Sequence, residues 1–272
     1  EIYLWHATEM CMGKITLDTI TSKNNKLIKD TKRLLTSSKA RQENKSFVLE
    51  GARLCFDVLN SVYEVSLFLI TRDAYNKYTE NADCVITLAD SSYLISEEIA
   101  EKLGETSTSQ GVFCVCKMNE TKEPLGDKII ILDNVQDPSN VGSIIRTGEA
   151  LGISSVITYN CCDIYNSKAV RASMGSVLRM NILDVDNLSQ FIKTVQNDGY
   201  RVYSTVPSKN ALSVKDVDFS GKSACVIGNE ANGVEQSIID ASNDTITVPM
   251  LGRAESLNAA VAASITMWEM LR

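Results

Sequence analysis

The side chains best suited to chemistry gather in three polar segments, each of which begins at the end of an apolar run. The segments are "DNVQDPSNVGSIIRTGEALG" (133–152), "IGNEANGVE" (227–235) and "VPMLGRAESLNAAVAAS" (248–264). They contain amide, guanidinium, carboxylate and hydroxyl side chains. Such groups can donate or accept hydrogen bonds to a bound molecule. A histidine-based triad or acid–base pair is disfavoured, because the single histidine stands in the unpatterned start of the chain.

The first segment predicts a helix from 140 to 151 that Gly152 ends. Two glycines inside it, Gly142 and Gly148, each cost about 1 kcal/mol relative to alanine. Since Gly142 precedes Arg146 by four residues, the two share a helix face. We interpret this face as a cleared surface beside the guanidinium, approached by a bound molecule. The alternative interpretation is a surface arginine, with glycine tolerated for packing.

In the second segment a buried strand delivers Gly228, Asn229 and Glu230 at its carboxyl end, and Gly233 follows in the turn. Glycine here permits a tight turn and close contact between backbone amides and a ligand. The alternative is a plain strand-to-helix turn. The chain contains neither GxGxxG nor GxxxxGK[ST], so a Rossmann dinucleotide site and a P-loop are both disfavoured.

Cap and core positions also follow from the residue types. We expect Ser139 or Asn140 to cap the helix predicted at 140–151, and Ser256 to cap the final helix of the chain. On spacing alone, three apolar residues of this final helix are predicted to lie in the core: Leu257, Val261 and Ile265.

Composition favours a globular chain in two domains. Its 272 residues are 44% hydrophobic, which is enough for a large core. No secretory signal and no membrane-spanning run is recognisable, so we expect a cytoplasmic location. The eight cysteines include no CxxC pair, and "CVC" (114–116) alternates within an apparent strand. Reduced structural thiols are therefore expected, without disulfides and without a metal site.

Charge is distributed unevenly along the chain. The net charge is −7, which by itself argues against a nucleic-acid partner. Residues 14–53, however, hold ten Lys or Arg against four Asp or Glu. A cationic amino-terminal module on an acidic body suits phosphate binding, and the alternative is an ordinary solvated helix face. The expected RNA contacts are Lys23, Lys26, Lys29, Lys32, Arg33, Arg41 and Arg53.

Hydrophobic patterning predicts two α/β domains. In the first, a basic amphipathic helix (22–35) precedes the strands "FVL" (47–49), "VSLFLIT" (65–71), "CVITLA" (84–89) and "GVFCVC" (111–116), with a helix at 96–103. After a polar linker the pattern restarts with "KIIILD" (128–133), "SVITY", "RVYSTV", "ACVIG" and "ITVPM" between helices. These near-continuous apolar strands favour a parallel sheet covered on both faces, with ligands beyond its carboxyl ends.

Taken together, the three segments resemble the motifs of the SpoU (TrmH-like) branch of the SPOUT RNA methyltransferases. "YNSKAVRASMGSVLRM" (165–180) is similar to the family's mid-domain segment, and "TSTSQGVFCV" (106–115) to the end of its substrate-binding domain. Three ordered motifs at matching spacing are far more specific than one loop. The resemblance divides the chain into a leader (1–11), an RNA-binding domain (12–118), a linker (119–126) and a SPOUT domain (127–272).

The resemblance implies methyl transfer from S-adenosylmethionine to a ribose 2'-hydroxyl of structured RNA, by a homodimer whose carboxyl-terminal domain contains a trefoil knot. It implies a catalytic and substrate-orienting set of Asn140, Arg146, Glu230, Ser256 and Asn258. It also implies cofactor contacts at Thr205, Gly228, Asn229, Val248, Met250 and Leu257. Because a guanidinium is a poor base, Arg146 is interpreted as an orienter, with proton acceptance as the weaker option.

Four alternatives remain open at this point. Ribosomal RNA is the expected substrate, and transfer RNA is the alternative within the family, which also includes base methyltransferases. A non-catalytic RNA-binding or assembly factor could retain the same fold. An unrelated nucleotide-dependent enzyme is disfavoured because its phosphate-loop motifs are absent.

Overall fold

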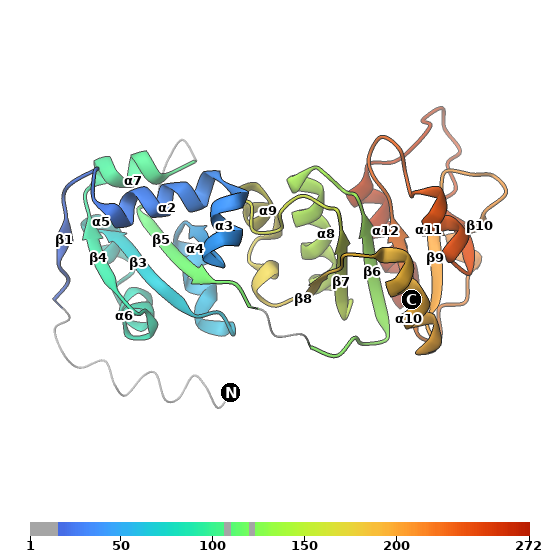
Figure 1. Ribbon diagram of the computed structural model, residues 1–272, viewed down its shortest axis with the longest axis horizontal. Coiled ribbons are helices and arrows are strands. Elements are labelled where there is room, and N and C mark those ends of the chain that lie inside the picture. Colours follow the sequence, from blue (N-terminus) through green and yellow to red (C-terminus); the bar gives the residue numbers. More distant parts are fainter. Residues whose placement is uncertain (1–15, 106–109, 120–122) are drawn as a thin grey trace. The chain divides into compact units, whose positions relative to one another are not determined.

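The structure, a computed structural model, describes residues 16–105, 110–119 and 123–272 (Figure 1). The chain divides into two compact units. The first comprises residues 1–120 with Tyr165–Ser167, and the second comprises residues 121–164 and 168–272. The expected leader, four residues of "TSTSQGVFCV" and the middle of the expected linker lie outside the described residues. The domain boundaries given above stay a prediction.

A five-stranded mixed sheet in the order β1-β4-β3-β5-β2 forms the centre of the first unit. β5 pairs antiparallel with β2 and β3, whereas β1, β4 and β3 are parallel. The strands are β1 (Thr19–Ile20), β2 (Ser46–Glu50), β3 (Val65–Thr71), β4 (Ser92–Ile95) and β5 (Val112–Lys117). The helices are α2 (Lys26–Thr36), α3 (Ser38–Asn44), α4 (Ala52–Asp57), α5 (Arg72–Lys77), α6 (Thr79–Leu88) and α7 (Glu97–Leu103).

The predicted basic helix corresponds to α2, whose apolar side packs into the core of the first unit. It begins four residues after the predicted start, with Asn25 as its cap, because the Asn25 side chain accepts from Leu27 N. Ile28 and Leu35 are buried against residues of α7 and β5. The lysines lie on the remaining surface of the helix, as the pattern predicted.

Arg41 is a correction to the predicted RNA-contacting set. Its side chain is only 2% exposed, and Nη1 donates to Leu34 O at 2.6 Å and to Leu35 O at 3.1 Å. These two carbonyl groups lie in the last turn of α2, where no N–H group of the same helix is available to bond them. Arg41 therefore completes the end of α2 from inside the fold, and it is not available to a phosphate.

The stretch "CVITLA" is a second correction, since residues 84–88 form the end of helix α6 and not a strand. Ala82 and Val85 are buried three positions apart, which is a helical spacing. The neighbouring "SYLI" forms β4 instead and pairs with β3. β-branched residues therefore misled the prediction, because tertiary packing outweighed local propensity.

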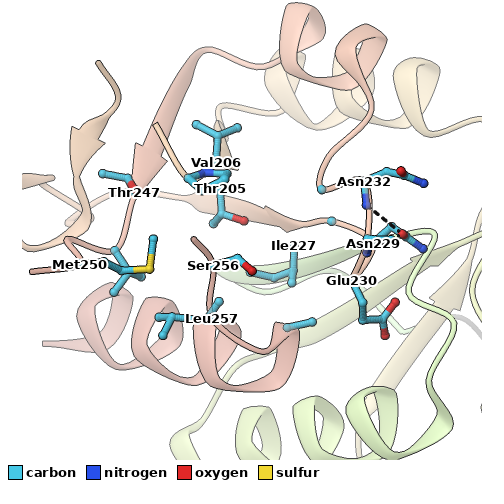
Figure 2. A pocket seen from close by; sticks show the side chains of 17 residues that line it. Thr205, Val206, Ile227, Asn229, Glu230, Asn232, Thr247, Met250, Ser256 and Leu257 are labelled. Carbon is cyan, nitrogen blue, oxygen red and sulfur yellow. Dashed lines mark hydrogen bonds between the residues drawn. The ribbon is translucent and has the colours of Figure 1, made fainter. Parts of the chain in front are cut away.

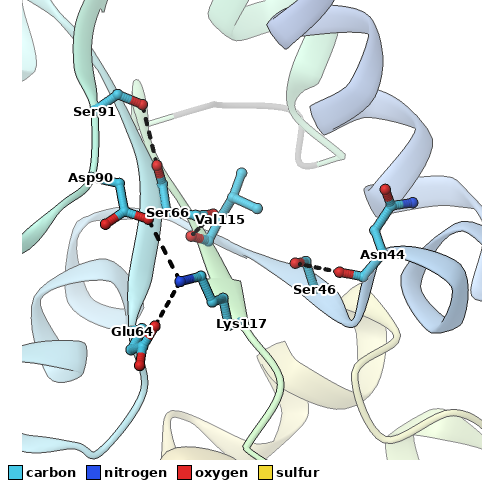
Figure 3. Close-up of polar contacts among 8 residues, drawn as sticks. All are labelled: Asn44, Ser46, Glu64, Ser66, Asp90, Ser91, Val115 and Lys117. Atoms are coloured by element: carbon cyan, nitrogen blue, oxygen red, sulfur yellow. Dashed lines mark hydrogen bonds and ion pairs between the residues drawn. The ribbon is translucent and has the colours of Figure 1, made fainter.

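Polar contacts join the strands of the first unit at one end of its sheet (Figure 3). Lys117 Nζ lies 2.7 Å from a Glu64 carboxylate oxygen and 3.7 Å from Asp90. The hydrogen bond and charge of Glu64 raise the pKa of Lys117. Ser66 Oγ donates to Val115 O across the β3–β5 pair. Lys117 thus connects the end of β5 to the segments that precede β3 and β4.

The second unit contains a seven-stranded parallel sheet in the order β10-β12-β9-β11-β6-β7-β8. Its strands are β6 (Lys128–Asp133), β7 (Ser155–Tyr159), β8 (Asn181–Asp184), β9 (Arg201–Thr205), β10 (Leu212–Ser213), β11 (Ser223–Ile227) and β12 (Asp244–Thr247). Its helices are α8 (Pro138–Leu151), α9 (Ser167–Ser173), α10 (Leu188–Asn197), α11 (Gln236–Ala241) and α12 (Ala259–Leu271). β8 and α10 were not predicted.

Helices cover both faces of this sheet. Alternate residues of β6 point into two different cores: Ile130 and Leu132 pack with α8 and α12, and Ile129 and Ile131 pack with α10 and α11. Two-sided burial explains the near-continuous apolar strands. The predicted α/β class and parallel sheet are confirmed.

The caps of α8 and α12 differ from the prediction. Asp137 caps α8 by accepting from Ser139 N, with Pro138 at the first helical position. Asn258, not Ser256, caps α12 by accepting from the backbone N–H groups of its first turn. The predicted end of α8 is confirmed, because Gly152 adopts φ +90° there.

Gly142 leaves room for the chain's own backbone, and this corrects our interpretation of the cleared surface. A Cβ at this position would lie 2.4 Å from Ala169 O and 2.6 Å from Ala172 Cβ, both in α9. Gly142 is buried whereas Arg146 is exposed, so the two do not share one open face. Gly148 similarly packs beside Met180 and Met267. The packing alternative therefore holds for both glycines.

Candidate active site

A pocket of about 250 Å³ opens at the carboxyl ends of β9, β11 and β12 (Figure 2). Those strands end in Thr205, Ile227 and Thr247, and all three residues line it. Its volume is close to the lower end of the usual range for small-molecule sites. The remaining lining residues are Val206, Pro207, Gly228, Asn229, Glu230, Ala231, Asn232, Gly233, Val248, Met250, Ser256, Leu257, Ala259 and Ala262.

One wall of the pocket is the tight turn after β11. Asn229 and Gly233 exchange two backbone hydrogen bonds, and Asn229 Oδ1 accepts from Ala231 N and Asn232 N (Figure 2). A Cβ on Gly228 would lie 2.1 Å from the backbone carbon of Gly233. Gly228 is therefore required by the chain's own turn. The Asn229 side chain is likewise occupied, because Nδ2 donates to Asn134 O at 2.7 Å.

A second part of the pocket lining, formed by Val248, Met250 and Leu257, carries backbone groups that can bond a ligand. Within the described part of the chain, the N–H and C=O groups of Val248, Met250 and Leu257 take part in no hydrogen bond. The same is true of Gly228 on the first wall. The side chains of Ile227, Val248, Met250 and Leu257 add an apolar lining. Apolar walls with a few unpaired polar groups are typical of cofactor pockets.

Asn140, Glu230 and Asn258 form a continuous chain of hydrogen bonds beside this pocket. Asn140 Nδ2 donates to Glu230 Oε1 at 2.9 Å, and Asn258 Nδ2 donates to Asn140 Oδ1 at 3.0 Å. Asn140 is only 6% exposed, so its side-chain amide needs these two hydrogen bonds in place of bonds to water. The Glu230 carboxylate also accepts from Gln136 N at 3.2 Å and Asp137 N at 3.1 Å. The hydrogen-bond chain from Asn258 through Asn140 to Glu230 thus joins the three polar segments of the sequence.

The same contacts keep Glu230 ionised. Burial raises the pKa of Glu230, but the hydrogen bonds from Asn140, Asp137 and Gln136 together outweigh it, so the pKa lies below its ordinary value. A carboxylate that accepts several hydrogen bonds is a poor proton acceptor at neutral pH. The geometry therefore favours an orienting role for Glu230.

The structure places Ser256 and Arg146 differently. Ser256 lines the pocket, and its hydroxyl has no hydrogen-bond partner among the described residues. Arg146 does not line the pocket. It is exposed on α8, without a hydrogen bond or ion pair to any residue that the structure describes. Ser256 is thus available to a ligand in the pocket, whereas the Arg146 side chain is exposed outside the pocket.

Cys162, whose thiol interacts electrostatically with Asp137 and Glu230, is unreactive at neutral pH. Burial raises the pKa of Cys162 to about 12, with further contributions from Cys161, Asp163, Asp137 and Glu230. The thiol therefore stays protonated at neutral pH and is a poor nucleophile. No disulfide joins cysteines within the described residues.

Two family models cover most of the chain. Residues 127–268 match the SpoU rRNA Methylase family, and residues 25–114 match an MRM3-like substrate binding domain. The chain belongs to the SpoU rRNA methylase family. The resemblance drawn from the three polar segments is confirmed.

Similar proteins span nearly the whole length of this chain. It is 31% identical over 252 residues to the 23S rRNA (guanosine(2553)-2'-O)-methyltransferase RlmP of Bacillus subtilis strain 168, covering 92% of this chain and 98% of that one. An AdoMet-bound rRNA methyltransferase from Sinorhizobium meliloti superposes with a TM-score of 0.84 at 26% identity, covering 93% and 97%. An RNA 2'-O ribose methyltransferase superposes with a TM-score of 0.77 at 25% identity, covering 93% and 98%.

As a SpoU methylase, the chain is a methyltransferase that acts on RNA and uses S-adenosylmethionine. The pocket fits that cofactor, since it combines apolar side chains with unpaired backbone N–H and C=O groups. Every cofactor contact that the resemblance implied lines this pocket: Thr205, Gly228, Asn229, Val248, Met250 and Leu257.

Sequence reasoning missed several residues of the site. Gln136 and Asp137 hold Glu230 through backbone N–H groups, which no side-chain pattern reveals. Ile227 and Thr247 line the pocket, and their place at the last position of a strand was the one available signal.

The described residues offer neither a cluster of metal-binding side chains nor a membrane-spanning helix. Residues 16–105, 110–119 and 123–272 contain no cluster of three or more His, Cys, Asp or Glu side chains placed to hold a metal ion. In the same part of the chain, no helix combines the length and the apolar character that a membrane span needs.

Proposed function

We propose that this SpoU methylase transfers a methyl group to a ribose 2'-hydroxyl of ribosomal RNA. The observation that carries the proposal is the Asn258–Asn140–Glu230 chain beside a pocket with unpaired backbone groups. The Bacillus subtilis relative is named for 2'-O-methylation of 23S rRNA, which supports both the ribose and the ribosomal assignment.

The residues of the site would act mainly by alignment. When bound, S-adenosylmethionine supplies an electrophilic methyl group that an in-line nucleophile can take. Asn140, held on both sides, and the ionised Glu230 would set the position of the polar groups that meet the ribose. The unpaired Ser256 hydroxyl can donate to the ribose or accept from it. Holding reactants in line can supply much of the rate.

We assign Arg146 the role of orienting the target hydroxyl and a neighbouring phosphate. Its guanidinium is exposed and has no partner among the described residues, so all five N–H donors are available. A guanidinium binds phosphate well and gives up a proton poorly. The proton would therefore leave to another acceptor, such as solvent or phosphate.

RNA would be held by the basic surface of the first unit. Lys29 and Arg53 are exposed and have no ion-pair partner among the described residues. Lys23, Lys26 and Arg33 form ion pairs with Glu98, Asp30 and Glu43. Exposed pairs of this kind are weak, so phosphate can replace the carboxylates. Lys32 donates to Leu103 O and would contribute less.

We make three further proposals from membership of this family, on the oligomeric state, the knot and the location of the protein. A second copy of the chain would cover the apolar side chains that α12 exposes: Val261 at 46%, Trp268 at 60% and Leu271 at 38%. This also corrects the core position predicted for Val261. The segment after β12 would form the trefoil knot, and the protein would act in the cytoplasm.

The experiment uses the full chain, methyl-labelled S-adenosylmethionine and total RNA from a strain that lacks the gene, followed by nucleoside analysis. Label in a 2'-O-methyl nucleoside of ribosomal RNA is the expected result. Label in transfer RNA or on a base would overturn the substrate or the position. Cofactor retention without label in any RNA, including intact ribosomal subunits, would instead favour a non-catalytic binding factor.

A further inference from the structure

Gln136 bridges two loops that follow neighbouring strands of the parallel sheet. Its side-chain nitrogen Nε2 donates to Asn134 Oδ1 and to Asn160 O, both at 2.6 Å. Asn134 directly follows β6, and Asn160 directly follows β7. The two asparagines adopt φ angles of +58° and +51°, in the left-handed region that few residues other than glycine occupy. The bridge therefore spans two sharp turns at the site's edge of the sheet.

Further contacts tie the same loop to its neighbours. Asn134 N donates to Tyr159 O at 2.9 Å, and Cys162 N donates to Val135 O at 3.0 Å. On the other side, Asn229 Nδ2 donates to Asn134 O. The strand order reverses between β6 and β11, where parallel sheets bind ligands. The loop of Gln136 therefore lies at this point of the sheet, bonded to the turn after β11 that forms one wall of the pocket.

The backbone of the same residue reaches the orienting carboxylate. Gln136 N and Asp137 N donate to the two oxygens of Glu230 at 3.2 and 3.1 Å. A small rotation of this loop would move both N–H groups away from Glu230. The side-chain bridge and the carboxylate contact are thus parts of one rigid turn.

We infer that Gln136 is a positioning residue for methyl transfer, whose side-chain amide holds the loop that fixes Glu230 and, through it, Asn140. The primary amide of Gln136 gives two N–H bonds from one nitrogen, to Asn134 Oδ1 and to Asn160 O, without adding a charge. A carboxylate of the same length could donate neither bond. The inference rests on the proposed function, since it assigns Gln136 to that same site.

The chain offers a matched control in Gln196. Its Nε2 donates to Ala241 O at 2.9 Å and to Asn243 Oδ1 at 3.1 Å, so it too bridges a carbonyl and an asparagine side chain. Gln196 lies in α10 and is not part of the pocket. Gln136→Glu and Gln196→Glu therefore remove the same kind of contact at two places.

The first measurement is kinetic. For Gln136→Glu we expect kcat to fall by about tenfold or more at about pH 8, because small misplacements are costly. KM for RNA and Kd for S-adenosylmethionine should stay within about threefold of wild type. The deficit should stay constant between about pH 6 and pH 8, because a carboxyl with the ordinary glutamate pKa of about 4.3 is ionised throughout this range and donates no hydrogen bond. Gln196→Glu should show no such deficit. Wild-type kcat in folded Gln136→Glu, or an equal loss in Gln196→Glu, would overturn the inference.

The second measurement needs no RNA. Hydrogen exchange of the backbone amides in residues 134–140 should be faster in Gln136→Glu than in wild type and unchanged in Gln196→Glu. Unchanged exchange in Gln136→Glu would overturn the positioning role whatever the enzyme's substrate. Absence of methyl transfer by the wild-type protein would overturn the proposed function alone, so the two failures can be told apart.

Discussion

The side-chain amide of Asn258 donates a 3.0 Å hydrogen bond to Oδ1 of Asn140, although 118 positions separate the two residues. The same Asn258 caps α12 through Oδ1, and Asn140 continues to Glu230. Both hydrogen-bonding ends of Asn258 are therefore used. The start of α12 and the first turn of α8 are thereby fixed relative to the carboxylate after β11.

Replacing Asn140 should damage transfer more than stability. Asn140→Ala leaves Glu230 without one donor and Asn258 without its acceptor, at a cost of about 1–3 kcal/mol in unfolding free energy. We expect kcat to fall by about a hundredfold. Asn187→Ala, which removes the cap of α10, is the matched control with a loss of about 1 kcal/mol and normal transfer. Thermal unfolding measures the stability of each variant, and methyl-transfer kinetics measure its kcat. Equal kcat values for Asn140→Ala and wild type would contradict the role assigned to Asn140.

The depressed pKa of Glu230 predicts a specific pH dependence. A folded-state pKa below the ordinary value of 4.5 means that ionised Glu230 stabilises the fold above that value. The stability is lost as the pH falls through the lower, folded-state pKa. The difference in melting temperature between wild type and Glu230→Gln should therefore be constant at neutral pH and shrink in acid. A difference that grows on acidification would show that the pKa is raised.

Arg146→Ala should separate binding of the cofactor from transfer. Because Arg146 lies outside the pocket, the Kd for S-adenosylmethionine should stay within about threefold of wild type while transfer is lost. Arg146→Lys keeps the charge without the planar fork and should recover only part of the rate. Calorimetry and methyl incorporation give the two readouts. Unchanged turnover in Arg146→Ala would remove Arg146 from the site.

Charge reversal at Lys29 and Arg53 should weaken RNA binding and lower its salt dependence. Each lost phosphate contact reduces the slope of log K against log salt by about 0.7–0.9. Lys193→Glu provides the control, because Lys193 is an exposed and unpaired lysine of α10 in the other unit. Filter binding across a salt series measures the slopes. Equal slopes for wild type and the double variant would place the interface elsewhere.

Gly142→Ala should destabilise the second unit. The added methyl group would lie 2.4 Å from Ala169 O and 2.6 Å from Ala172 Cβ, so α8 and α9 must separate. Overpacking of this kind costs about 1–3 kcal/mol. A Cβ at Gly221 would meet nothing within 4 Å, so Gly221→Ala should leave the melting temperature unchanged. Equal stability of the two variants would contradict the packing role.

Local pattern was sufficient for most elements of the second unit. β6 and β7 were predicted at their observed bounds, because strands buried on both faces are unbroken apolar runs between turn residues. The end of α8 was predicted because glycine adopts the left-handed conformation that a helix end often requires. "CVITLA" failed because packing, not β propensity, determined α6.

Apolar period and motif spacing are local properties of the chain, and they were enough to predict the fold class, the family and the segments that supply the site. Which groups of those segments meet follows from the tertiary fold alone. It placed α9 against Gly142, withdrew Arg41 into the end of α2 and brought Gln136 N to Glu230 across 94 positions. Such contacts depend on how whole elements pack, and no spacing within one segment encodes a distance to another.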